Sequence, residues 1–139
     1  MTESVVTASP GDSVQSVAAL MRERGVGSVV LVEDGGSPVG LITDRDLALS
    51  VVAEGRPASD PASEHASSPV IRAEPDMDVE EAGQKMLRHG VRRLVVVSGG
   101  SVAGVITLDD LASRGLEPEL SARVTRAALP DYFFHARGG

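Results

Sequence analysis

Apolar residues near the start of the chain recur at two different spacings. After the turn Ser9-Pro10-Gly11, apolar side chains at helical spacing predict an amphipathic helix that begins after Ser13 and ends at Gly25; they are Val14, Val17, Ala18 and Met21. Residues 29–32 are all valine or leucine, which is typical of a short strand buried on both faces. The pattern therefore opens with a strand at residues 5–7, then a helix and a second strand.

A tight turn and a second helix complete this pattern. The turn over residues 33–38 is rich in glycine and precedes another apolar strand at residues 39–42. Thr43 then opens a helix that we expect to span residues 44–53. Apolar groups lie on more than one side of this helix, which favours self-association; they are Leu47, Leu49, Val51 and Val52. The predicted order is strand, helix, strand, strand, helix.

The same order returns after Ser68. Residues of the first helix, its glycine stop and the following strand have counterparts at one constant distance along the sequence. In order, Pro10, Ser13, Val14, Met21, Gly25, Val26 and Val32 correspond to Pro75, Asp78, Val79, Met86, Gly90, Val91 and Val97. Beyond the second turn the offset is shorter by one residue, and there Thr107 and Asp110 match Thr43 and Asp46. These correspondences indicate an internal duplication.

The duplication divides the chain into a first repeat at residues 1–54, a linker at residues 55–68, a second repeat at residues 69–115 and a tail. The linker is rich in proline, serine, alanine and charged residues, which is the composition of an exposed loop. One helical turn is expected near its end, at residues 64–67.

The tail, residues 116–139, departs from the repeat. We expect a helix over residues 117–129 that ends at Pro130, with an apolar side made of Leu116, Leu120, Val124 and Ala127 or Ala128. All aromatic residues of the chain follow it: Tyr132, Phe133 and Phe134. Two interpretations stay open. The tail packs on its own module or on that of a dimer mate, or it docks onto another protein, because clustered exposed aromatic residues mark interaction surfaces.

One motif occurs at the end of each predicted hairpin: Gly40-Leu41-Ile42-Thr43-Asp44-Arg45-Asp46 and Gly104-Val105-Ile106-Thr107-Leu108-Asp109-Asp110. In both, a threonine stands at the helix N-cap and an acid follows three residues later. This is the pattern of a capping box, which needs no ligand. The same geometry also aims a hydroxyl, backbone N–H groups and the positive end of a helix at one spot, which suits a phosphate or ribose. Because the motif occurs twice in matching contexts, we favour a ligand site.

Composition excludes several classes of function. The chain has 139 residues, enough for a substantial core, with 42% hydrophobic and only 2% aromatic content, so aliphatic side chains must form that core. A net charge of −7 argues against nucleic acid as the main partner. No apolar run approaches the roughly 20 residues of a membrane span, and the first residues lack the pattern of a signal peptide, so a cytoplasmic location is expected. The absence of cysteine excludes disulfides and thiolate chemistry.

The remaining polar residues show no catalytic spacing. His65, His89 and His135 lie in the linker, at a helix end and in the tail, without the spacing of metal ligands. No Ser/His/Asp set or paired carboxylate stands out. We therefore expect neither an enzyme nor a resident metal.

The ordered pattern resembles a known family. Two copies of strand, Pro-x-x-Ser/Asp-Val, helix, Gly-Val, apolar strand and Gly-x-x-Thr-x-x-Asp are similar to a tandem pair of cystathionine-β-synthase (CBS) domains, also called a Bateman module. The resemblance covers roughly residues 5–50 and 69–114. It implies an α/β fold of the α+β type, with two repeats packed around a pseudo-twofold axis. It also implies clefts at their interface for an adenosyl ligand such as AMP, ADP, ATP, S-adenosylmethionine or NAD, with no cofactor required.

The resemblance also implies roles for particular residues. Asp46 and Asp110 would accept hydrogen bonds from ribose hydroxyls, since a carboxylate can accept from both groups of a cis-diol. Thr43 and Thr107 would contact phosphate or ribose oxygens. The adenine pocket would be lined by residues of the opening strands and of the segments after each glycine stop: Val6, Thr7, Ala8, Val26, Gly27, Ser28, Val70, Ile71, Ala73 and Val91.

The two halves differ where phosphates would lie. The second repeat has Arg92 and Arg93 directly after its Gly-Val pair, whereas the first has Gly27-Ser28. Guanidinium groups bind phosphate bidentately, so we expect Arg92 or Arg93 to reach a phosphate. The alternative is that both are solvated residues at the start of a strand. Arg45 offers a further phosphate contact, or it pairs with a nearby acid on the surface.

By this resemblance the chain is a regulatory protein that senses an adenine nucleotide and signals to a partner protein. A flat homodimer formed through the helices after the Thr–Asp motifs is implied as well. Since no catalytic or transporter domain is attached, the regulated target is expected outside the chain. The alternative is a dimerisation or scaffold module whose clefts hold no ligand. The preference among adenosyl ligands and the partner cannot be deduced from these residues.

Overall fold

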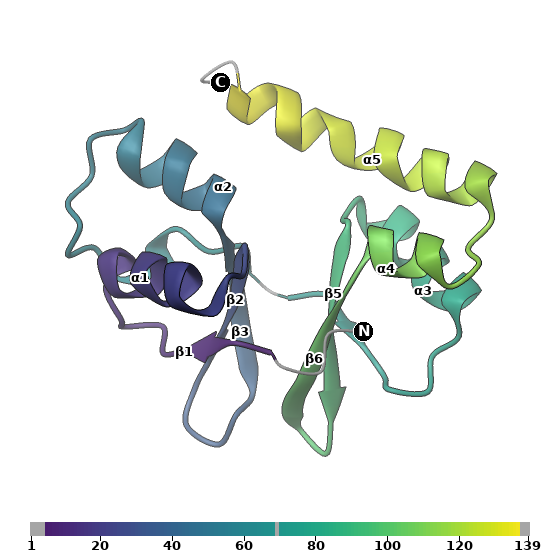
Figure 1. The fold of residues 1–139 in the computed structure, drawn as a ribbon, viewed down its shortest axis with the longest axis horizontal. Helices are drawn as coiled ribbons and strands as arrows, with labels where there is room; N and C mark the ends of the chain where they lie inside the picture. The colour runs from purple at the N-terminus through teal and green to yellow at the C-terminus, as the bar shows by residue number, and fades with distance from the viewer. Residues whose placement is uncertain (1–4, 69, 137–139) are drawn as a thin grey trace. The chain divides into compact units, whose positions relative to one another are not determined.

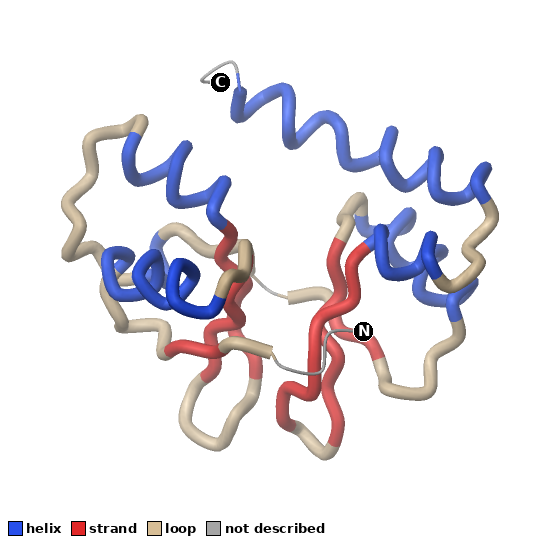
Figure 2. The backbone as a smooth tube through the Cα atoms, viewed as in Figure 1, coloured by secondary structure: helices blue, strands red, loops and turns tan. Residues whose placement is uncertain are grey.

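The computed structural model describes residues 5–68 and 70–136, with side chains of the last helix described as far as Ala128. The chain forms two compact units. The N-terminal unit comprises Ser4–Val70 with Gly100–Val102, and the C-terminal unit contains Ile71–Gly99 and Ala103–Gly139. Each unit is built around its own three-stranded sheet (Figures 1 and 2).

The N-terminal unit has the predicted element order. Its elements are β1 (Thr7–Ala8), α1 (Val14–Arg24), β2 (Ser28–Val32), β3 (Pro38–Thr43), α2 (Asp44–Asp46), η1 (Leu47–Val52) and η2 (Ala62–Glu64). The sheet order is β1-β2-β3, with β1 parallel and β3 antiparallel to the central β2. The middle of β2 is apolar and buried on both faces of the sheet: Val29, Val30 and Leu31 are at most 1% exposed.

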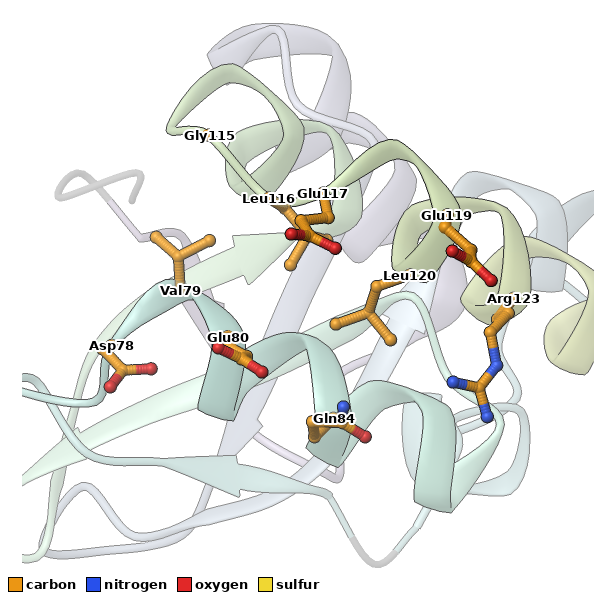
Figure 3. A pocket seen from close by; sticks show the side chains of 10 residues that line it. All are labelled: Asp78, Val79, Glu80, Gln84, Gly115, Leu116, Glu117, Glu119, Leu120 and Arg123. Atoms are coloured by element: carbon orange, nitrogen blue, oxygen red, sulfur yellow. The ribbon is translucent and has the colours of Figure 1, made fainter.

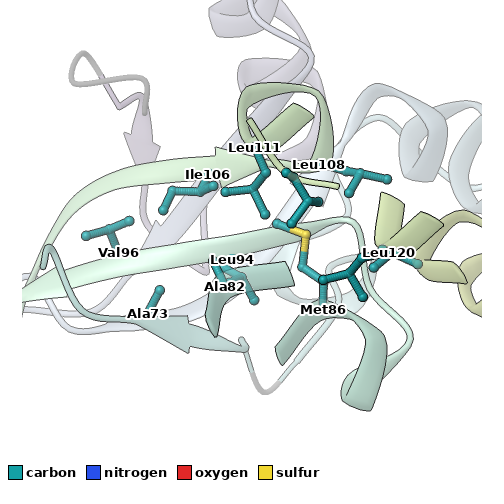
Figure 4. Close-up of a cluster of buried hydrophobic side chains, with 11 residues drawn as sticks. Ala73, Ala82, Met86, Leu94, Val96, Ile106, Leu108, Leu111 and Leu120 are labelled. Atoms are coloured by element: carbon teal, nitrogen blue, oxygen red, sulfur yellow. The ribbon is translucent and has the colours of Figure 1, made fainter. Parts of the chain in front are cut away.

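The C-terminal unit repeats this order. It contains β4 (Arg72–Ala73), α3 (Val79–His89), β5 (Arg93–Ser98), β6 (Ser101–Thr107), α4 (Leu108–Ser113) and α5 (Pro118–Ala136). The sheet order β4-β5-β6 matches that of the first unit, and β4 is parallel to β5. Figure 4 shows the core, in which Met86 of α3 lies among leucine side chains from α4, α5 and β5. The mixed α/β architecture with two equivalent repeats confirms the predicted fold class.

The predicted helix limits are confirmed in both repeats. The Ser13 hydroxyl accepts from the Ser16 N–H at 3.1 Å, and the Asp78 carboxylate accepts from the Glu81 N–H at 2.8 Å. At the opposite ends, Gly25 and Gly90 have φ values of 65° and 63°. Only glycine adopts this left-handed conformation without strain, so these two glycines end α1 and α3.

The segment after Thr43 differs from the expected continuous α-helix. Only Asp44–Asp46 is α-helical, and residues Leu47–Val52 form a π-helical segment. The Ser50 hydroxyl donates to the Asp46 carbonyl at 2.8 Å, so a side chain competes there with the regular backbone ladder. Val51 is buried, whereas Val52 is 75% exposed.

The linker is docked onto the first repeat, so the expectation of an exposed loop is wrong for its centre. Ala62 is fully buried and Asp60 is 7% exposed. Backbone bonds hold it in place: the Val14 N–H donates to the Asp60 carbonyl at 2.9 Å, and Ser67 exchanges bonds with Leu41 of β3 at 2.9 and 3.0 Å. Its helical turn is the 3-10 helix η2, slightly earlier than expected.

The tail forms a long helix that packs on its own unit. Leu116, Leu120 and Val124 belong to the same hydrophobic core as α3 and α4. Close approach to α3 depends on Gly83, because a Cβ there would lie 2.8 Å from Leu116 Cδ1 and 3.1 Å from Leu120 Cδ2. This confirms that residues 116–128 pack on their own module.

The helix does not end at Pro130 as expected, because α5 continues to Ala136. A proline inside a helix removes one backbone donor but does not always end it. The side chains of Tyr132, Phe133 and Phe134 lie outside the described residues. In the part of the chain that the structure describes, no helix is both long and apolar enough to cross a membrane.

Candidate functional site

Each repeat carries a Thr–Asp turn at the start of the helix that follows its hairpin. The Asp46 N–H donates to Thr43 Oγ1 at 3.1 Å, and the Thr43 N–H donates back to Asp46 Oδ2 at 2.8 Å. The turn of the second repeat has matching bonds of 3.1 and 2.9 Å between Thr107 and Asp110. The capping box predicted from the motif is confirmed in both copies.

The capping box uses only part of each acidic side chain. It occupies Oδ2 of each aspartate, and Oδ1 takes no part in the cap. Both aspartates are half-buried, so the surrounding structure fixes the position of the second oxygen. A negatively charged acceptor is therefore presented beside a threonine hydroxyl and a helix N-terminus.

Each turn is held against the segment that follows the glycine stop. The Asp44 N–H donates to the Gly27 carbonyl at 3.0 Å, and the Leu108 N–H donates to the Arg92 carbonyl at 2.9 Å. In the first repeat Ser28 also pairs with Thr43 across the sheet. In each repeat the Thr–Asp turn and the segment after the glycine stop, which are distant in the sequence, are therefore bonded to each other.

The two turns differ in charge. A Cβ at Gly27 would lie 3.2 Å from Asp44 Oδ2, so in the first repeat a carboxylate occupies this space. The second repeat has Leu108 in place of Asp44 and Arg92 in place of Gly27. Arg92 and Arg93 are half-buried at the start of β5. The second turn is therefore the better environment for an anion.

The residues expected to line the adenine pocket lie in or just before the opening strand and the central strand of each sheet. The Val30 N–H donates to the Val6 carbonyl at 3.0 Å, and the Val95 N–H donates to the Ile71 carbonyl at 2.9 Å. The side chains of Val6 and Ala73 are buried in the hydrophobic cores, whereas Thr7 is exposed. Gly27 is exposed as well. The remaining residues of this set are half-buried: Ala8, Val26, Ser28, Val70, Ile71 and Val91.

Replacement of Thr107 by valine should test the cap itself. Valine keeps the shape of threonine but removes the oxygen that accepts from the Asp110 N–H. Loss of an N-cap acceptor costs about 1 kcal/mol, so the free energy of unfolding should fall by about that amount. Urea denaturation measures the change. An unchanged denaturation midpoint would contradict the assigned cap.

Sequence reasoning missed a group of polar side chains in the N-terminal unit. Ser50 Oγ lies 2.9 Å from His65 Nδ1, and His65 Nε2 lies 2.9 Å from Asp60 Oδ2. The Arg56 guanidinium donates to both oxygens of Asp60, at 2.9 and 3.3 Å. The hydrogen bonds from Arg56 and then from His65 lower the pKa of the Asp60 carboxyl, and the bond to Asp60 raises the pKa of Arg56. The separation of these residues in the sequence gave no recognisable spacing.

This group has the composition of a catalytic triad, and its serine also bonds to the backbone. The Ser50 hydroxyl donates to the Asp46 carbonyl at 2.8 Å. Asp60, Glu64 and His65 also offer ligand atoms within 4.8 Å of one another. However, a cation at Asp60 would have to displace the Arg56 guanidinium from both oxygens. The group is best described as an ion-pair and hydrogen-bond network.

A separate groove lies in the C-terminal unit between the start of α3 and the start of α5 (Figure 3). Its volume is about 610 Å³, and four acids and one arginine line it: Asp78, Glu80, Glu117, Glu119 and Arg123. Leu116 and Leu120 form its apolar part, where α5 packs near Gly83. None of the residues predicted for the ligand site lines this groove, and its acidic rim does not suit a nucleotide phosphate.

Comparison with known proteins agrees with this geometry. The CBS domain family matches the chain twice, at residues 1–53 and 62–117. The chain belongs to the CBS domain family. Each CBS match contains one Thr–Asp turn, so the duplication seen in the sequence is a tandem pair of CBS domains.

Similar proteins extend over most of the chain. The CBS domain-containing protein YhcV of Bacillus subtilis is 39% identical over 119 residues, which cover 86% of this chain and 84% of YhcV. Among solved structures, an uncharacterized conserved protein from Pyrococcus horikoshii has a TM-score of 0.73 at 30% identity, covering 84% of this chain and 89% of the other. The CBS domain protein PAE2072 from Pyrobaculum aerophilum, solved in complex with AMP, has a TM-score of 0.71 at 28% identity, covering 91% and 95%.

Proposed function

We propose that this CBS pair is a regulatory protein that binds AMP, ADP, ATP or another adenosyl ligand and signals its presence to a partner protein. The observation that carries this proposal is the Thr–Asp turn, which occurs twice with the same hydrogen bonds. Helix capping alone accounts for the aspartate oxygen that accepts the threonine N–H in each turn. It does not explain why both repeats hold an acid and a threonine against the segment after the glycine stop.

Asp46 and Asp110 would bind ribose. A carboxylate oxygen fixed beside a helix N-terminus can accept hydrogen bonds from both hydroxyls of a cis-diol, and such charge-assisted bonds are stronger than neutral ones. The Thr43 and Thr107 hydroxyls would contribute contacts to ribose or phosphate oxygens. The likeness to PAE2072, which was solved with AMP, supports an adenosyl ligand.

Phosphate binding would favour the second repeat. Arg92 and Arg93 would supply guanidinium groups there, since the Arg92 backbone carbonyl accepts from the Leu108 N–H beside the Thr107 turn, whereas Asp44 places a negative charge next to Gly27 in the first repeat. Arg45 would partly offset that charge. We therefore expect a nucleotide to place its phosphates toward the Arg92 side and expect an unequal affinity of the two repeats.

Signalling requires a ligand that binds one arrangement of the protein more tightly than another. The receiving partner would be another protein, and the functional form would be a cytoplasmic homodimer. Val52, an apolar residue of η1 that is 75% exposed, supports self-association through this segment. The second candidate, a scaffold module without ligand, rests on the fact that the capping boxes are complete without one.

A panel of thermal unfolding measurements tests the proposal. The ligands would be AMP, ADP, ATP, S-adenosylmethionine and NAD, with GMP as a control that keeps ribose and phosphate but changes the base. A ligand at 100 times its Kd adds about 2.7 kcal/mol, which raises the Tm by several degrees. A rise with at least one adenosyl ligand but not with GMP is expected. A flat panel would favour the scaffold.

A further inference from the structure

The groove between α3 and α5 is built from residues that the Thr–Asp turns do not use (Figure 3). Glu80 and Gln84 stand on the side of α3, and Glu117 and Arg123 stand on the side of α5. Its volume of about 610 Å³ is typical of a ligand pocket. Because both helices pack in one hydrophobic core, the groove forms without a second molecule.

The floor of the groove is apolar. Leu116 and Leu120 line it with 6% and 8% of their surface exposed, and the half-buried Val79 adds to it from the start of α3. Both leucines are held close to Gly83, where a Cβ would meet their methyl groups. An apolar centre inside a polar rim is the usual composition of a protein–protein interface.

The rim of the groove carries an excess of negative charge. Its carboxylates belong to Asp78, Glu80, Glu117 and Glu119, and its single guanidinium belongs to Arg123. The N-termini of α3 and α5 favour nearby acids and together offset about one of these negative charges. In the part of the chain that the structure describes, no ion pair forms at Glu80, Glu117 or Glu119. These carboxylates are therefore accessible to cations from outside the chain.

The spacing of the rim acids argues against a metal ion as the occupant. Among the described residues, only the group of Asp60, Glu64 and His65 brings such ligand atoms within 4.8 Å of one another. Carboxylates that stand further apart suit several separate cations on one chain. A second copy of this protein is a poor occupant because it carries a net charge of −7, and nucleic acid and anionic lipid are repelled in the same way.

We propose that the groove between α3 and α5 binds a basic segment of a partner protein, in which lysine or arginine residues flank apolar residues. The cationic side chains pair with carboxylates on both walls, at Glu80 and Glu117, and the apolar side chains cover Leu116 and Leu120. This proposal rests on the proposed function in that it gives the regulatory protein a surface for its partner. Charge complementarity of this kind speeds association and selects against acidic partners.

An NMR titration of the full chain with a model peptide tests the proposal. The probe is a lysine peptide about ten residues long with leucine residues at its centre, which spans roughly 33 Å when extended. It should shift the backbone amide signals of residues 79–84 and 119–123. Its affinity should fall about tenfold in Glu80→Gln/Glu117→Gln, because an exposed ion pair contributes up to about fivefold. Both replaced residues are exposed, so this variant should keep the fold.

Glu33→Gln/Asp34→Asn is the matched control. It removes the same number of carboxylates from an exposed turn of the N-terminal unit, so it should leave the affinity unchanged. A peptide with serine in place of leucine should bind several-fold more weakly, because serine cannot cover the apolar floor. Equal affinity of the wild type and Glu80→Gln/Glu117→Gln would overturn the proposal. An equal loss in the control, or equal binding of the serine peptide, would do the same, because binding would then reflect net charge alone.

Two further outcomes would identify a different situation. Absence of peptide-induced shifts on α3 and α5 would remove the groove as a docking site. Self-association of the wild type that is lost in Glu80→Gln/Glu117→Gln would make a second copy the occupant, and it would also overturn the proposal. The titration contains no nucleotide, so its failure is distinguishable from a flat thermal panel, which would instead count against the adenosyl ligand.

Discussion

Replacement of both Asp46 and Asp110 by asparagine should weaken nucleotide binding at least tenfold while the protein stays folded. An asparagine oxygen can still accept the N–H of Thr43 or Thr107, so the caps survive. The amide lacks the negative charge that would bind the ribose hydroxyls, and hydrogen bonds to charged groups contribute about 1.5–3 kcal/mol. Affinity should therefore fall at least tenfold, by about 1.4 kcal/mol or more, as measured by calorimetric titration with the ligand that the thermal panel selects.

Asp109→Asn is the matched control for this result. Asp109 is an exposed acid in the same first turn of α4, and its side chain takes no part in the cap. Each of these Asp→Asn replacements removes one negative charge. Unchanged nucleotide affinity in the control would therefore assign the loss of affinity to Asp46 and Asp110. The single variants would show which repeat binds more tightly, and we expect the larger loss from Asp110→Asn. Undiminished affinity in the double variant would contradict the ribose role.

The features that could be predicted from sequence are those that short segments encode. Ser13 and Gly25 mark the limits of α1 because an N-cap oxygen and a left-handed glycine act within one turn of the helix. The capping boxes of Thr43 and Thr107 are local in the same way. The order of strands and helices could be predicted because the same sequence pattern occurs in both repeats.

The features that could not be predicted depend on contacts between distant residues. Ser50, Asp60 and His65 meet only because the linker folds back along α1 and β3, and their composition alone indicated a loop. The π-helical segment Leu47–Val52 was not predicted either; within it the Ser50 side chain bonds to the Asp46 carbonyl. The continuation of α5 past Pro130 likewise contradicts a local rule.

The second large effect concerns the docking of α5. Val124 is fully buried in the core of the C-terminal unit, where it packs with Leu116 and Leu120. Replacement by aspartate would bury an unpaired charge, which costs about 3–5 kcal/mol, a large fraction of the stability of a typical domain. We expect the Tm to fall by roughly 10 °C and the backbone amides of residues 119–128 to lose protection from hydrogen exchange, because undocking of the helix is the least costly response.

Ala122→Asp places the same charge on the same helix at an exposed position. This control should cost only about 0.5 kcal/mol, mainly through helix propensity, and should leave hydrogen-exchange protection intact. Equal Tm values for Val124→Asp and Ala122→Asp would mean that α5 is not part of the core. The tail would then be free to dock onto a dimer mate or another protein. A large difference would assign residues 116–128 to the fold itself.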